Sequence, residues 1–368
     1  MSFAQRLLVT AGLAVMLLFG GFAATVTKAE VIDYTVAALT TGSVVDPAPI
    51  ITQSPPFLPD FPLAIDIQAA EFDPTVRTAT ATLTVASNPP VTEVSEGAAT
   101  ASVDPVLSVG ARSKVSSGDV LFPDDCGCMF NNSLAGLNAT MSNPLDGGAT
   151  VDLMLHVEGT LVLKRVSGAG VLQQCDPFDA TCQLVSDVAA GVSVLLALAD
   201  VVDLDSFDLF LFPEDLAVLP LFNGSLTLEL APLTDELGDP LLDTEGNFVG
   251  FMPVLTKEGD FLTNGTIVMD DGEGGLCSLS RCDVHVTLDL LFTDVQSLGF
   301  GELFDVGLLM ETFVDGPSAE GRELDANFFD TASVNITFLP TAVPAPASLL
   351  LLGLGLLGMA AARRRRLH

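Results

Sequence analysis

Two groups of carboxylates are the sequence's strongest candidates for cation chemistry. One occupies residues 200–208, and the other lies in the Gly-rich run 270–275. Their members are Asp200, Asp203, Asp205 and Asp208 in the first group, and Asp270, Asp271 and Glu273 in the second. Oxygen ligands on turns suit calcium, although neither group has EF-hand spacing. The competing interpretation, which we prefer, is that these acidic loops keep the protein soluble.

Cysteines form the second set of reactive side chains, in three local pairs. They are Cys126, Cys128, Cys175, Cys182, Cys277 and Cys282. An even number in a chain that is exported predicts disulfides. Pairing within 175–182 and within 277–282 would close short loops, whereas a 126–128 bridge would be a tight ring, so that pair can instead bond elsewhere. The C-x2-C spacing of metal sites is absent.

Catalytic residues are scarce. Beyond the C-terminal residue, the only histidines are His156 and His285, each between two apolar residues of an alternating pattern, which predicts a place on the polar face of a strand. The chain has neither G-x-S-x-G nor H-E-x-x-H. With no Trp and a single Tyr, it offers little for stacking on sugars, which disfavours a glycosidase. We therefore expect that the protein is not an enzyme.

Alternating β-branched and polar residues predict the elements that must position these groups. Expected strands cover 78–85, 151–157, 160–166, 224–230, 266–270, 284–292 and 333–339. Glu158-Gly159 predicts a hairpin turn, and Asn-Gly pairs at 223–224 and 264–265 predict further turns. The stretch 184–199 suits either a helix or a buried strand. The fold class is mainly β, as a β-sandwich or jelly roll.

Charge excludes one large class of function. Residues 30–342 hold all 47 acidic residues but only eight of the 14 basic ones, which is a formal net charge of −39. Such a chain would be repelled by phosphates, so we expect no nucleic-acid partner. A hydrophobic content of 49% is too high for a disordered protein.

The N-terminus has the features of a secretory signal peptide. Arg6 precedes an apolar stretch, 7–24, and small residues that allow cleavage after Ala23, Ala24 or Ala29 follow it. The alternative is an uncleaved anchor, but the apolar stretch is short for a span. Export is the preferred interpretation.

The C-terminus contains a second targeting pattern. It consists of Val343, Pro344, Ala345 and Pro346, then 14 apolar or small residues at 349–362, then Arg363, Arg364, Arg365 and Arg366. As a helix the apolar stretch would be about 21 Å long, short for a bilayer unless its flanks contribute. The arginines would stay cytoplasmic. A plain single-pass anchor is the alternative to a sorting signal.

This arrangement resembles the PEP-CTERM sorting signal, in which a Pro-x-Pro motif, an apolar helix and an Arg-rich end follow one another. Ala345 stands where glutamate is typical. The resemblance covers 343–368 and implies recognition by exosortase, a membrane protease-transpeptidase that cleaves near the motif. It implies nothing about the fold of the rest of the chain.

The expected organisation is a signal peptide at 1–29, a Pro-rich segment at 30–62, a β-rich extracellular domain at 63–342, and the sorting signal at 343–368. The third part is one domain or two, with a boundary near 120–150. Six prolines within 47–62 favour an extended linker or an edge-covering loop.

The functional hypothesis is an exported cell-surface or matrix protein, sorted by exosortase and structural in role, in contact with extracellular polysaccharide or biofilm. Its expected partners are exosortase and, transiently through the C-terminal helix, the inner membrane. Calcium is the one cofactor considered. The alternative is a calcium-dependent carbohydrate-binding or adhesion module, and a secreted hydrolase with paired carboxylates is the third choice.

Overall fold

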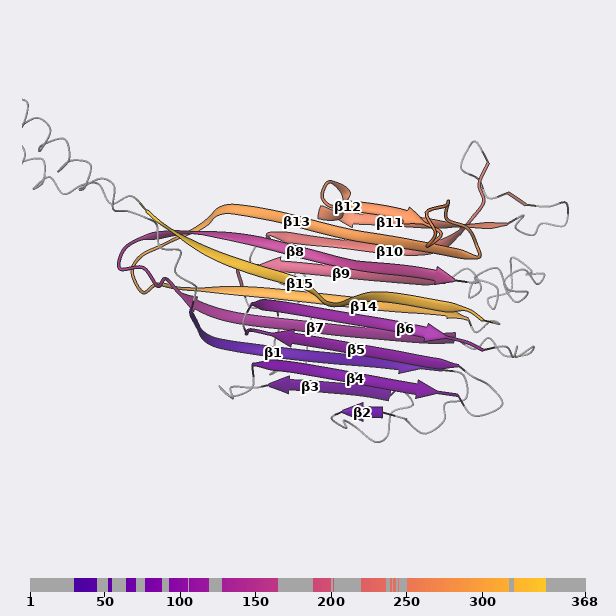
Figure 1. Cartoon of the computed structure of the whole chain (residues 1–368), viewed down its shortest axis with the longest axis horizontal. Helices are drawn as coiled ribbons and strands as arrows, with labels where there is room; N and C mark the ends of the chain where they lie inside the picture. The colour runs from indigo at the N-terminus through magenta and orange to yellow at the C-terminus, as the bar shows by residue number, and fades with distance from the viewer. Residues whose placement is uncertain are drawn as a thin grey trace, which may run out of the picture.

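The computed structural model describes most of the chain between residues 30 and 341 (Figure 1). The described residues are 30–44, 52–54, 64–70, 77–87, 93–104, 106–118, 128–164, 188–199, 201, 220–235, 239, 241–242, 244, 250–317 and 321–341. The expected signal peptide, the prolines at 55–62 and the C-terminal helix lie outside these residues. Within them, no helix is both long and apolar enough to cross a membrane.

Two antiparallel sheets make up the fold. In spatial order, the seven-stranded sheet contains β11 (Phe251–Gly259), β10 (Phe222–Pro232), β9 (Ala189–Ala197), β14 (Leu303–Pro317), β7 (Cys128–Ser142), β1 (Glu30–Ser43) and β3 (Ala64–Ala70). The eight-stranded sheet contains β12 (Thr266–Asp270), β13 (Arg281–Leu298), β8 (Ala149–Lys164), β15 (Glu323–Pro340), β6 (Leu107–Ser116), β5 (Val94–Ser102), β4 (Thr78–Ala86) and β2 (Thr52–Ser54). A short 3-10 helix, η1 (Asp260–Leu262), precedes β12.

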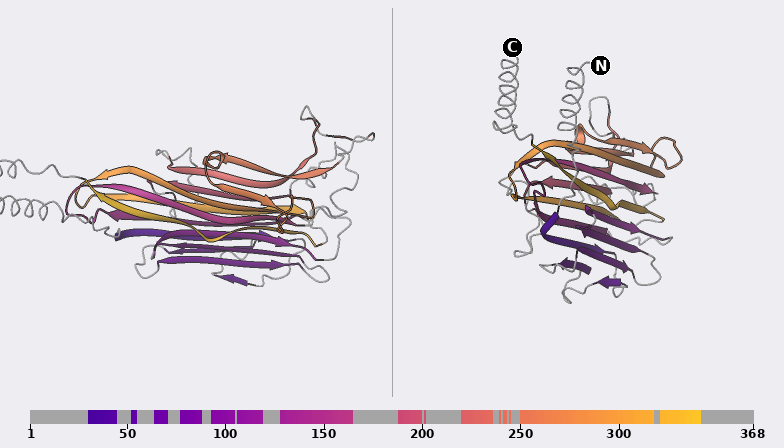
Figure 2. Two further views of the ribbon diagram at one scale, coloured as in Figure 1. Left: turned by 45° about the horizontal axis from the view of Figure 1, so that its top comes forward. Right: turned by 60° about the vertical axis from the view of Figure 1, so that its left-hand side comes forward.

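The mainly β fold expected from the sequence is confirmed, and the packing is that of a sandwich. Strands of both sheets run along the long axis of the molecule (Figures 1 and 2). One hydrophobic core joins the inner faces of both sheets, because apolar residues alternate with polar ones along each strand. In β4, for example, Ala79, Ala81, Leu83 and Val85 are buried between threonines and other outward-facing residues.

The hairpin expected at Glu158-Gly159 is wrong, because β8 runs without interruption from Ala149 to Lys164. Gly159 pairs with Val286 of β13, and a Cβ added at Gly159 would collide with the buried ring of Phe328 in β15. The glycine therefore provides room for a ring and makes no turn. The result is a 16-residue strand in the centre of the sheet.

The two Asn-Gly pairs differ in the same way. Gly224 lies inside β10, and the T-shaped pair of Phe222 and Phe261 packs beside it. The turn expected there is wrong. Gly265 has φ of 90° and directly precedes β12, so the turn expected at 264–265 is confirmed. The stretch that suited either helix or strand contains strand β9.

β1 lies within the residues assigned to the Pro-rich segment, yet it is an interior strand between β7 and β3. Chain on both sides of residues 120–150 contributes to both sheets, since β14 pairs with β7 and β9, and β15 pairs with β6 and β8. The start of β1 and the end of β15 lie at one end of the sandwich, on the left in Figure 1. We call this the tail end, and the opposite end, where β13 begins, the far end.

Candidate functional site

Three side chains with metal-ligand chemistry meet on the β12–β13 hairpin at the far end. Antiparallel pairing places Asp270 directly opposite Asp283. His285 lies two residues after Asp283, and the period of two in a strand turns both side chains to the same outer face. One ligand atom from each of the three lies within 4.8 Å of the others. Asp283 is buried, Asp270 is half-buried and His285 is exposed.

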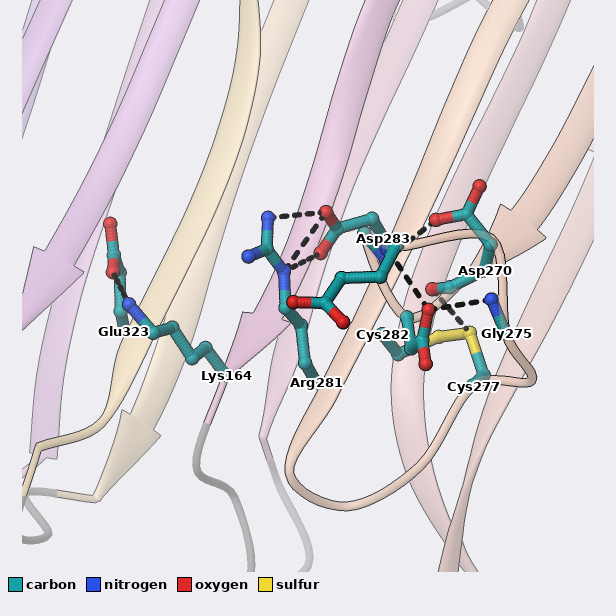
Figure 3. Close-up of polar contacts among 11 residues, drawn as sticks. Lys164, Asp270, Gly275, Cys277, Arg281, Cys282, Asp283 and Glu323 are labelled. Atoms are coloured by element: carbon teal, nitrogen blue, oxygen red, sulfur yellow. Dashed lines mark hydrogen bonds and ion pairs between the residues drawn. A yellow bond between two sulfur atoms is a disulfide. The ribbon is translucent and has the colours of Figure 1, made fainter.

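Two carboxylates and one imidazole suit a borderline metal such as zinc better than calcium, which prefers oxygen ligands alone. A cation is already present, however. The guanidinium of Arg281 donates from Nε to Asp283 Oδ1 at 3.0 Å and from Nη2 to Oδ2 at 2.7 Å (Figure 3). This hydrogen bond with Asp283 raises the pKa of Arg281. A metal ion would therefore have to displace Arg281 from Asp283.

The acidic run 270–275 directs its carboxylates toward its own backbone. Asp270 Oδ1 accepts a hydrogen bond from the Gly272 amide at 2.6 Å. Asp271 Oδ1 accepts from the amides of Glu273 and Gly275, at 2.9 and 2.7 Å, and these bonds lower the pKa of Asp271. Of the three carboxylates that the sequence analysis assigned to calcium here, only Asp270 joins the three-residue cluster. The other two help to shape a turn.

The disulfide expected within 277–282 is present, between Cys277 and Cys282 (Figure 3). It joins the loop after β12 to the start of β13, so it closes the hairpin that carries Asp270 and Asp283. Cys128 is the first residue of β7. The remaining residues singled out from the sequence lie outside the described part of the chain: Cys126, Cys175, Cys182, Asp200, Asp203, Asp205, Asp208, Val343, Pro344, Ala345, Pro346, Arg363, Arg364, Arg365 and Arg366.

Next to the hairpin, ion pairs form a stripe across the outer face of the eight-stranded sheet, over β6, β15, β8 and β13. We call it the charged stripe. Its pairs are Arg112–Asp325 at 2.7 Å, Lys114–Glu323 at 3.0 Å, Lys164–Glu323 at 3.1 Å and Arg281–Asp283 at 2.7 Å. Four of the eight basic residues of 30–342 are used here. The acidic excess is therefore carried by the rest of the surface.

Glu323 is the centre of the charged stripe because it accepts from two lysines at once. Partial burial alone would raise its pKa, but the hydrogen bonds from Lys114 and Lys164 outweigh that effect, and the pKa of Glu323 is lowered. Arg112 binds Asp325 through two parallel hydrogen bonds, at 3.1 and 2.7 Å, and this raises the pKa of Arg112. The stripe thus ties four strands together across the sheet.

Sequence reasoning placed both histidines on polar strand faces, and this is confirmed. His285 is exposed between buried Val284 and Val286, and His156 Nδ1 lies 2.8 Å from Asp289 Oδ1 on the neighbouring strand. The meeting of His285 with Asp270 and Asp283 was missed. The signal was the Asp-x-His spacing at 283–285 next to an expected strand that ends at Asp270, because a hairpin between the two strands brings these residues together.

Comparison with known proteins bears on the C-terminal tail alone. A family model described as the PEP-CTERM protein-sorting motif matches residues 342–366. No curated protein and no solved structure matches the chain. The match contains both prolines of the sorting motif, the apolar stretch and all four arginines. The tail is thus a PEP-CTERM protein-sorting motif, which implies an exported chain that exosortase processes from a membrane-anchored intermediate.

Proposed function

We propose that the protein is a structural, non-enzymatic component of the cell surface or extracellular matrix, delivered by exosortase and associated with extracellular polysaccharide. The observation that carries the proposal is the sorting motif at 342–366. Because the motif acts on delivery, the role after delivery is argued from the sandwich itself.

Two properties of the sandwich support a structural role. Its core is continuous across both sheets, so the strands of the two layers stabilise one another as a single body. Its surface combines a net charge of −39 over 30–342 with a stripe that consumes half of the basic residues. A strongly acidic surface keeps copies of the protein hydrated and apart, which suits a protein that persists outside the cell among hydrated polymers.

The delivery route can be tested by changing the motif. The full chain is expressed in cells with and without exosortase, and its distribution among inner membrane, cell surface and medium is measured. A chain with Pro344→Ala and Pro346→Ala should accumulate in the inner membrane, because both prolines of the motif are lost. The matched control is Ala345→Glu, which supplies the typical glutamate and should sort like the unchanged chain. Equal distributions for all chains, with or without exosortase, would refute the route.

The second candidate function is a calcium-dependent carbohydrate-binding or adhesion module. The cluster of Asp270, Asp283 and His285 is the observation that favours a metal-linked function of this kind. It ranks second because Arg281 already neutralises Asp283 and because one of the three donors is an imidazole.

Thermal unfolding separates the two candidates. A binding module predicts that calcium raises the unfolding midpoint and that chelator reverses the rise, since a ligand that binds only the folded state stabilises it. In Arg281→Gln, which frees Asp283, a metal bound at the cluster should give a larger shift. Asp270→Asn should remove the shift. If no divalent cation moves the midpoint of either the unchanged chain or Arg281→Gln, this second candidate fails.

A further inference from the structure

The tail end of the sandwich is organised around Asn143, which is buried. Its Nδ2 donates to the carbonyl of Gly147 at 2.7 Å and to the carbonyl of Gly299 at 2.9 Å. It therefore joins the β7–β8 loop (143–148) to the β13–β14 turn (299–302). The same loop holds the end of β15, because the Thr341 amide donates to the Gly148 carbonyl at 2.9 Å. The β13–β14 turn and the point where the sorting tail begins thus share one hydrogen-bonded unit.

Large apolar side chains are exposed around this unit. Phe300 stands on the β13–β14 turn between Gly299 and Gly301 and is 70% exposed. The others are Ile32 near the start of β1, Leu303 at the start of β14 and Leu339 near the end of β15, at 54%, 53% and 38%. We call these four residues the apolar rim. They come from four separate segments that meet at one end of the sandwich, at the left in Figure 1.

The length of the remaining chain limits where this end can go. Eight residues separate Thr341 from Leu349, the first residue of the apolar stretch of the sorting motif. Fully extended, they span at most about 28 Å. While the apolar stretch is in the bilayer, the tail end is therefore held close to the membrane, and the far end points away from it.

We propose that the apolar rim rests on the lipid bilayer in the anchored intermediate, with Phe300 inserted at the boundary between headgroups and acyl chains. The proposal depends on the delivery route proposed above, because the sorting tail supplies the tether. Apolar and aromatic side chains on a protein surface partition into this boundary, and a Phe on a turn between two glycines can enter it without moving a strand.

The charges beside the apolar rim decide which lipid it suits. The nearest carboxylates are Asp33, Glu302 and Asp305. They accept hydrogen bonds from the Tyr34 amide, the Gly299 amide and the Thr140 hydroxyl, at 2.9, 2.6 and 2.7 Å. Anionic headgroups would be repelled by these groups, so the partner is a neutral, zwitterionic phospholipid. Because the contact is apolar, added salt should not weaken it.

The absence of tryptophan from the chain gives a direct test. Phe300→Trp places the sole tryptophan on the apolar rim. Leu276→Trp places it at the far end, where Leu276 is 90% exposed on the disulfide loop, and is the matched control. Each full-length variant is reconstituted into phosphatidylcholine vesicles with brominated acyl chains, which quench only tryptophans that reach the acyl region. Vesicle flotation is measured on the same samples.

The expected result is that both variants float, that emission from Phe300→Trp is quenched several-fold more than emission from Leu276→Trp, and that high salt leaves the difference unchanged. If both float and neither tryptophan is quenched more than the other, the rim does not touch the bilayer, while the delivery route stands. If neither variant floats, the tether itself is absent, and the delivery route fails together with the proposal. A quenching difference that disappears in salt would also overturn the apolar contact.

Discussion

The ring of Phe328 packs over Gly159, halfway along the central strand β8. Phe328 directly precedes an irregularity in β15, where the register with β8 shifts between Asn327 and Ala332. The missing side chain of Gly159 thus compensates for the ring and lets β8 continue past it. This contact explains why one long strand occupies the place of two short ones.

Gly159→Ala should destabilise the protein by about 1–3 kcal/mol, because a methyl group at this position forces a fully buried ring out of its place. Urea unfolding measures the difference. Gly147→Ala is the control, since an added Cβ there meets no atom within 4 Å, and it should change stability little. Phe328→Leu in the Gly159→Ala background should recover part of the loss. Equal stability of the two alanine variants would contradict the packing described here.

Glu323 predicts a stability change in acid. Its pKa is lower in the folded protein than in the unfolded chain, so its contribution is complete above the ordinary glutamate pKa of 4.5 and is lost as pH falls below that value. The side chain is partly exposed, so the effect is on the order of 1 kcal/mol or less.

The test compares unfolding at neutral and acidic pH. Glu323→Gln should be less stable than the unchanged chain at neutral pH, and the difference should shrink below pH 4.5. Glu158→Gln changes an exposed carboxylate outside the charged stripe and should leave the pH profile as it is. A Glu323→Gln profile parallel to that of the unchanged chain would exclude the two lysine contacts as a source of stability.

The disulfide should stabilise the β12–β13 hairpin by about 2 kcal/mol at most, because it closes a very short loop. Cys277→Ala removes the bond and keeps the buried sulfur of Cys282 in place. We expect faster amide hydrogen exchange in β12 and the start of β13, with exchange in β6 and β15 unchanged. Uniformly faster exchange in all four strands would instead show that the bond supports the whole sandwich.

Asn143→Ala should loosen the tail end, because two backbone carbonyls lose a buried donor. The expected cost is about 1–3 kcal/mol, with faster exchange confined to residues 143–148 and 299–302. Asn335→Ala, at an exposed position of β15, is the control and should have little effect. An unchanged exchange rate in the 299–302 turn would contradict the role given to Asn143.

The strands were predictable because a period of two in hydrophobicity records which face is buried. The expected strand at 266–270 coincides with β12, and the ambiguous stretch became β9 because its alternation is buried between two neighbours. Glycines were misread at 159 and 224. A glycine that makes room for a ring and a glycine that turns the chain look alike locally, and the rings concerned, Phe328 and Phe261, lie far along the sequence.

The candidate site was only partly predictable for a related reason. Asp270 stood out within an acidic run, but its neighbours in space come from the next strand, so they become visible only once β12 and β13 are paired. Arg281 carries the same lesson. A lone arginine says nothing about cation binding until pairing places it against Asp283 and shows that the carboxylate already has a positive partner.

Delivery by exosortase through the tail is the central claim, and the intact mass of the native protein tests it most directly. Protein purified from the cell surface and the medium should have a mass that ends near Val343 and lacks the apolar stretch and the four arginines. The full-length tail should be found only in an inner-membrane fraction that decreases with time. Surface or released protein that still carries residues 343–368 would contradict the account.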